Sequence, residues 1–107
     1  MSDLRFRIIY HFGREIDIKT KVESGFLIFS NQSILIEGKN YSDLPFSSFR
    51  QVELFRLNGL GRMIKLECVD CTIFLSVVWL NISGYFAIIN FFGTGKLFEK
   101  LKKKALH

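Results

Sequence analysis

Hydrophobic and polar residues alternate along the first part of the chain, which is the pattern of a half-buried β-strand. Within residues 4–12 the apolar side chains fall mainly on the even positions, and Arg5, Arg7 and His11 fall on the odd ones. Residues 15–22 alternate in the same way, and a Gly-Arg pair suited to a turn separates the two segments. The two segments are therefore predicted to form a β-hairpin.

Short apolar segments separated by turn-forming residues continue the β pattern. Further strands are predicted at residues 26–29, 34–36, 51–57, 63–68 and 71–79. The only proline, Pro45, is expected in a connection and not in a central strand. At the end of the chain, Thr94 suits a helix N-cap, and Leu97, Phe98 and Leu101 would share one face of that helix. The pattern thus predicts a mainly β fold, an antiparallel barrel or sandwich of about seven strands, with one C-terminal α-helix.

A long uncharged stretch runs from Cys71 to Gly95. Roughly 20 apolar residues can cross a bilayer, and the lysines that follow would suit a cytoplasmic flank. Polar or flexible residues such as Asn81 and Gly84 interrupt the stretch, and its first half is rich in β-branched residues. We therefore interpret it as a buried strand, a turn and an apolar segment packed on the sheet. For residues 82–92 a short helix and a last strand both remain open.

Composition limits the classes of protein to which the chain can belong. Its 107 residues, 49% of them hydrophobic and 15% aromatic, predict one domain over residues 1–107 with a dense core, and they exclude a disordered chain. The first residues lack the apolar region of a signal peptide. Two cysteines do not make a secreted disulfide scaffold. A cytoplasmic location, with peripheral attachment to the membrane as an extension of it, is expected.

The net charge of +5 is concentrated near the C-terminus. Five lysines lie there against the single carboxylate of Glu99; they are Lys96, Lys100, Lys102, Lys103 and Lys104. With Arg14 from the predicted first turn, they are the candidate residues for binding an anion or a membrane surface. The alternative is a solvated helix face with no specific partner.

Residues 24–78 carry a resemblance to a known superfold. The segment 24–36, SGFLIFSNQSILI, is similar to the strand–Asn turn–strand hairpin of GRAM-like domains, and LPFSSFRQV at 44–52 is similar to the sequence that leads into their next strand. With the order of elements, seven strands and then a helix, the chain resembles a pleckstrin-homology-like or GRAM-like domain of bacterial type. The resemblance implies a module that binds phosphoinositide head groups or peptides. Lipid-binding members gather several Lys and Arg in the loop between their first two strands, whereas this chain has only Arg14 there, beside Glu15.

Cys68 and Cys71 form a C-x-x-C motif between two predicted strands. If the two residues between them make a turn, the thiols face each other across a hairpin. A zinc site would need four ligands, and a second cysteine pair is missing from the chain. Three interpretations stay open: small buried hydrophobic residues, a redox-sensitive pair, and a metal site shared with a second chain.

Other chemistry finds little support in the residues. Gly93, Gly95 and Lys96 could hold an anion before a helix, although a plain capping turn explains them as well. Two histidines at remote positions and scattered carboxylates make no catalytic set, so no enzyme, cofactor or resident metal is expected. Nucleic acid is not expected as a partner either, because acidic residues dilute the basic face of the first predicted hairpin.

The sequence therefore predicts a non-enzymatic binding module for protein–protein or membrane-surface interaction. The expected partner is a protein or an anionic lipid surface. The alternative is a self-associating structural domain, a homo-oligomer with an apolar aromatic interface that includes Trp79, Tyr85, Phe91 and Phe92.

Overall fold

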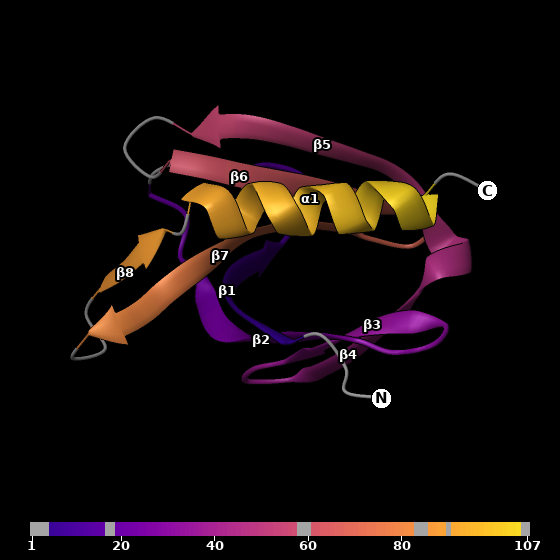
Figure 1. Ribbon diagram of the computed structural model, residues 1–107, viewed down its shortest axis with the longest axis horizontal. Coiled ribbons are helices and arrows are strands. Elements are labelled where there is room, and N and C mark those ends of the chain that lie inside the picture. Colours follow the sequence, from indigo (N-terminus) through magenta and orange to yellow (C-terminus); the bar gives the residue numbers. More distant parts are fainter. Residues whose placement is uncertain (1–4, 17–18, 58–60, 83–85, 90, 106–107) are drawn as a thin grey trace.

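Eight β-strands and one C-terminal α-helix form the described part of the chain (Figure 1). The structure is a computed structural model and describes residues 5–16, 19–57, 61–82, 86–89 and 91–105, with the side-chain surroundings of residues 79–92 left out. The strands are β1 (Arg5–Phe12), β2 (Glu23–Phe29), β3 (Ser33–Glu37), β4 (Tyr41–Pro45), β5 (Phe49–Leu57), β6 (Gly61–Cys68), β7 (Thr72–Ile82) and β8 (Phe86–Ile89). A short 3-10 helix, η1 (Phe46–Ser48), precedes β5, and the α-helix is α1 (Phe91–Ala105).

The strands are joined in one antiparallel sheet with the order β4-β3-β2-β1-β7-β6-β5. The predicted fold class, mainly β with about seven antiparallel strands and one C-terminal helix, is confirmed. Within the described part of the chain, strand β8 pairs only with the end of β7, past the last residues of β7 that pair with β1 and β6. The two edges of the main sheet are β4 and β5, and η1 connects them.

The sheet bends so that β2, β3 and β4 form one layer and β5 and β6 another, with α1 lying across the strands β5 to β7 (Figure 1). Gly25 permits a close approach within the first layer, because a Cβ atom there would collide with the backbone carbonyl of Glu37. The main core lies between the inner face of the sheet and α1. Its fully buried members include Ile8, Leu27, Ile34, Ile36, Ile64, Leu66, Ile73, Leu75, Leu97 and Leu101.

The predicted hairpin of residues 4–12 with 15–22 is wrong. Strand β1 pairs with β2, and residues 15–16 and 19–22 form a connection, while 17–18 lie outside the described residues. The alternation at 15–22 has a different cause: Ile16 and Val22 pack on a second apolar cluster on the outer face of the sheet. That cluster consists of Ile9, Met63, Phe74 and Val78. The apolar residues of a connection that covers a sheet face therefore show the same period of two as a strand.

The last third of the chain resolves the open alternatives. The uncharged stretch begins as strand β7. Of the open segment 82–92, Ile82 ends β7, residues 86–89 form the last strand and 91–92 begin the helix, while 83–85 and 90 lie outside the described residues. No helix among the described residues is long and apolar enough to cross a bilayer. Helix α1 begins at Phe91, three positions before the predicted cap at Thr94.

The sequence pattern did not predict strand β4, because proline is a residue type expected in a connection and Pro45 is part of this strand. The proline ends an edge strand, where the lost N–H donor interrupts no ladder.

Candidate functional site

Helix α1 is fixed to the sheet by a strip of buried side chains. Leu97 and Leu101 are fully buried in the main core, and Phe98 and Ala105 pack partly against it. These positions repeat at intervals of three and four residues, so they occupy one side of the helix. The remaining circumference of α1 is left for solvent or a partner.

Thr94 forms the polar part of this attachment. It is fully buried, and its Oγ1 accepts a hydrogen bond from the backbone N–H of Val77 at 3.0 Å and lies 3.3 Å from the Val77 carbonyl, to which it donates. In the β6–β7 register, Arg62 would stand opposite Val77, but the pairing of the two strands ends at Ile64 and Leu75. Thr94 therefore supplies the hydrogen bonds that a strand partner would have made. The predicted N-cap role is wrong, because this threonine lies within the first turns of the helix and bonds a strand.

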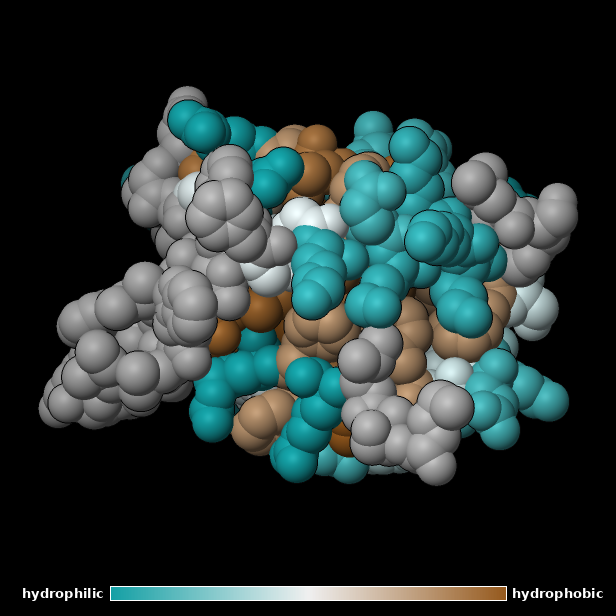
Figure 2. Space-filling model, in the orientation of Figure 1, coloured by the Kyte–Doolittle hydropathy of each residue, from teal (hydrophilic) through white to brown (hydrophobic). Residues whose placement is uncertain are grey.

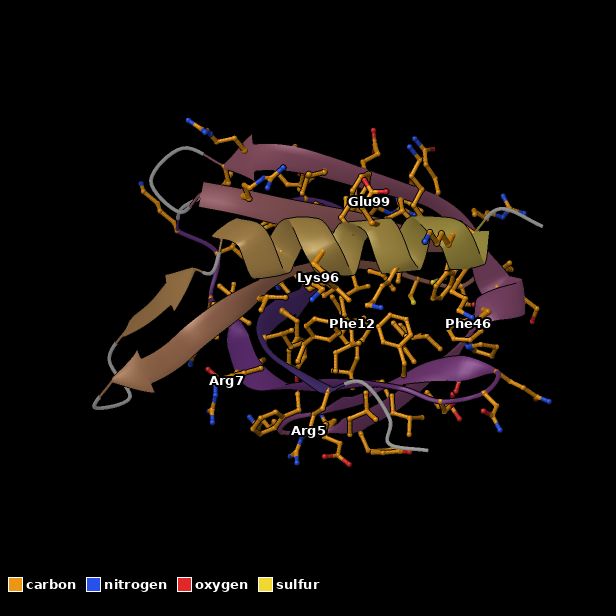
Figure 3. All side chains as sticks on the ribbon, viewed as in Figure 1. Arg5, Arg7, Phe12, Phe46, Lys96 and Glu99 are labelled. Atoms are coloured by element: carbon orange, nitrogen blue, oxygen red, sulfur yellow. The ribbon has the colours of Figure 1, made fainter. Side chains whose placement is uncertain are left out.

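Four of the five C-terminal lysines share one side of α1. Lys96, Lys100, Lys103 and Lys104 are spaced by four, three and one residues, which places them along one strip of the helix surface. Figure 3 shows Lys96 on the part of α1 toward the β2–β4 layer and Glu99 toward β5, so Glu99, three residues after Lys96 and four before Lys103, borders this strip on its far edge. We call Lys96, Lys100, Lys103 and Lys104 the lysine side.

The lysine side borders a groove of about 340 Å³. Phe29 and Ser30, at the end of β2, line it together with Lys100, Lys103 and Lys104. Among these described lining residues there is no carboxylate. Figure 2 shows hydrophilic side chains gathered over α1 and apolar surface beside them, between the helix and the β2–β4 layer. The groove thus combines an apolar floor with a cationic rim.

Lys104 is oriented by an aromatic ring. Its Nζ lies 4.8 Å from the centroid of Phe46, the first residue of η1. A cation over a ring face is attracted by the ring quadrupole, and this contact holds the ammonium group at the rim of the groove. Phe46 itself is buried and packs edge-on against Phe49. The position of Lys104 is therefore linked to the core through two aromatic rings.

The other two predicted binding residues lie elsewhere. Lys102 is exposed on the opposite flank of the helix, where its Nζ lies 5.7 Å from the ring centroid of Phe98. Arg14 lines a different groove, beside Cys68 and Cys71. The structure therefore brings together four of the six predicted residues and separates Lys102 and Arg14 from them.

A second basic feature was not predicted as a site. The guanidinium carbons of Arg5 and Arg7 lie 4.0 Å and 4.9 Å from the ring centroid of Phe26. Arg7 stands directly opposite Phe26 in the β1–β2 ladder. Figure 3 shows both arginines beside the β2–β4 layer, away from α1. The alternation placed both arginines on an outer face, but the register that gives them Phe26 depends on the pairing of β1 with β2.

The cysteine pair lies at the hairpin between β6 and β7. Both cysteines are free thiols; Cys68 is buried and Cys71 is half-buried. The pKa of the Cys68 thiol is raised from 9.0 to about 11, mainly because burial disfavours the thiolate. A hydrogen bond with the Ser48 side chain acts in the opposite direction, while the proximity of Cys71 and Asp70 adds to the rise.

The structure also decides on the predicted anion loop near residues 93–96 and on metal binding. Gly93, Gly95 and Lys96 lie inside α1, so they form no loop before a helix that could cradle an anion. A Cβ at Gly95 would stand 2.8 Å from the guanidinium of Arg62 on β6, the end of a flexible side chain. Among the described residues, no group of three His, Cys, Asp or Glu side chains could hold a metal ion.

Comparison with known proteins adds no identification. No protein-family model matches the chain, and no curated protein is significantly similar to it.

Proposed function

We propose that this chain is a non-enzymatic binding module that attaches to anionic membrane surfaces through the lysine side of α1. The observation that carries the proposal is the groove in which Lys100, Lys103 and Lys104 surround Phe29. The resemblance to pleckstrin-homology-like and GRAM-like domains supports it through the order of elements and the segments at 24–36 and 44–52. The location that follows is cytoplasmic, with peripheral attachment to the membrane.

The charges of the groove would contribute to a reversible attachment. A lysine close to an anionic membrane contributes on the order of 1 kcal/mol, so the three groove lysines together contribute about 3 kcal/mol, or roughly a hundredfold in affinity. Such attraction falls with ionic strength, because salt screens charges beyond a Debye length. The apolar floor at Phe29 adds a contact that salt does not screen.

Co-sedimentation with liposomes tests this function. The vesicles contain phosphatidylserine or phosphoinositide in a neutral lipid, with neutral vesicles as the control, at low and at physiological salt. The test variant replaces Lys100, Lys103 and Lys104 with Gln. The matched control removes the same charge elsewhere, through Lys102, Arg50 and Arg56, which are all exposed.

The proposal predicts binding that requires anionic lipid, is lost in the groove variant and is kept in the control variant. Equal loss in both variants would show that only net charge matters and would overturn the role of the groove. An absence of binding to any vesicle would instead favour an acidic protein as the partner.

Self-association is the second candidate, and the ribbon formed by the end of β7 with β8 favours it. Past Val78, which belongs to the outer cluster, Asn81 and Ile82 pair with β8 and, among the described residues, with no strand of the main sheet. An isolated two-stranded ribbon is at best marginally stable in water, so a second copy could stabilise it. The side chains of the predicted aromatic interface, Trp79, Tyr85, Phe91 and Phe92, lie outside those that the structure describes. Sedimentation equilibrium over a range of protein concentrations tests this function, and a mass of one chain throughout would reject it.

A further inference from the structure

Cys68 and Cys71 stand directly opposite each other across the β6–β7 hairpin. Cys68 ends β6, and Cys71 lies one residue before β7 begins. The register in which Glu67 pairs with Thr72 continues to the two cysteines, and the Cys68 N–H donates to the Cys71 carbonyl at 2.8 Å. The predicted arrangement of two thiols facing each other across a hairpin is therefore confirmed.

The backbone hydrogen bond determines the spacing between the side chains. Residues that form a hydrogen-bonded cross-strand pair have Cβ atoms near the wide end of the ~4.5–5.5 Å range. A relaxed disulfide requires Cβ atoms about 3.5–4.5 Å apart. Direct S–S bonding would therefore strain this hairpin, whereas a single atom between the two sulfurs would fill the extra distance.

We propose that Cys68 and Cys71 form a two-thiolate site for a soft monovalent metal ion, Cu(I). Thiolates are the ligands that select Cu(I). The binding step is Cu⁺ + 2 Cys–SH → [Cu(S–Cys)₂]⁻ + 2 H⁺, with no change of oxidation state. Zn²⁺ fits less well, because a structural zinc site takes four ligands and no group of three His, Cys, Asp or Glu side chains among the described residues could hold a metal ion.

The surroundings support such a site. The Val69 N–H donates to the Ser48 carbonyl at 2.9 Å, which ties the hairpin turn to η1. A groove of about 470 Å³ gives access to both cysteines, and Arg14 lines it. The complex carries one negative charge; of the charged side chains that line the groove, the Arg14 guanidinium would offset it and the Asp70 carboxylate would oppose it. This gives Arg14 a role separate from the lysine side, where the sequence had grouped it.

An anaerobic titration with Cu(I) against a coloured competing chelator tests the site. The wild-type chain is expected to bind one Cu(I), and Cys68→Ser and Cys71→Ser are each expected to bind it at least tenfold more weakly. Arg14→Gln, which leaves both thiols in place, is expected to weaken binding by a smaller factor. Circular dichroism of each variant checks that it is folded. X-ray absorption at the copper edge of the wild type provides a second measurement, in which two sulfur neighbours are expected.

Three results would overturn the proposal. Unchanged Cu(I) affinity in either serine variant would show that the two thiols do not act together. One ion for every two chains, with Cu(I) or with Zn²⁺, would show a site shared between copies. Rapid oxidation by glutathione disulfide, seen in the intact mass as the loss of two hydrogen atoms, would show that the thiols bond directly and that the spacing argument is wrong.

Discussion

On one side of α1, Leu97, Leu101 and Thr94 are fully buried, whereas on the other side Lys96 and Lys103 are exposed. The buried side joins strands that are distant in the sequence, because it packs on β5, β6 and β7. The lysine side contributes only the wall of a groove. This division implies that stability and partner binding can be changed separately, through residues that are neighbours on one helix.

The largest effect is expected from removing bulk on the buried side. Leu101→Ala leaves a cavity in the main core and is expected to lower the free energy of unfolding by about 2–5 kcal/mol. Urea denaturation followed by circular dichroism measures this loss. Under conditions where the variant is folded, its binding to anionic vesicles should match that of the wild type. A selective loss of lipid binding would mean that the two sides do not act independently.

The next largest effect concerns the hydrogen bonds of Thr94. Thr94→Val keeps the shape but leaves the N–H and carbonyl of Val77 without this partner. Burial of unsatisfied polar groups is expected to cost about 1–3 kcal/mol in the free energy of unfolding. Thr94→Ser keeps the hydroxyl and is the matched control, expected to retain most of the stability in the same urea titration. If the valine variant were as stable as the serine variant, the hydroxyl would not hold α1 to β7.

A smaller effect is expected from a single charge on the lysine side. Lys103→Gln should weaken binding to phosphatidylserine vesicles by about 1 kcal/mol, roughly fivefold, while Lys102→Gln on the opposite flank should leave it nearly unchanged. Both residues are exposed, so both variants should keep the free energy of unfolding within about 0.5 kcal/mol of the wild type. Equal weakening by the two variants would assign the attraction to the whole helix and not to one side.

The sequence predicted much of the fold because most of its strands carry the required pattern. The apolar segments at 26–29, 34–36, 51–57 and 63–68 lie within strands of the structure. The prediction failed where a local pattern reflects packing against elements that are distant in the sequence. The apolar residues at 15–22 cover an outer cluster and do not extend a hairpin. Thr94 likewise has the residue type of a cap but serves as a partner for β7.

The candidate site was predictable only in part, for a similar reason. Helical spacing alone shows that Lys96, Lys100, Lys103 and Lys104 share one side. The floor of the groove comes from Phe29, about 70 residues earlier in the chain, and no local pattern connects the two. The cysteine pair was more predictable, because a two-residue turn fixes the register of a hairpin.

The two cysteines also differ in burial, because Cys68 is buried and Cys71 is half-buried. This difference predicts a pH effect on the free energy of unfolding. Burial raises the pKa of the Cys68 thiol to about 11. Between pH 9.0, its ordinary pKa, and about 11, the thiol ionises in the unfolded chain but stays protonated in the folded one. The unfolded state then binds fewer protons, so the free energy of unfolding should fall as pH rises through this window.

Lysine and tyrosine side chains titrate in the same range, so the informative quantity is the difference between variants. Urea titrations at several pH values in that window should show a shallower decline for Cys68→Ser than for the wild type. Cys71→Ser should follow the wild type more closely, because the proximity of Cys71 contributes less to the pKa of Cys68 than burial does. If the wild type and Cys68→Ser declined in parallel, the Cys68 thiol would ionise as freely in the folded chain as in the unfolded one, and the hairpin would not shield it.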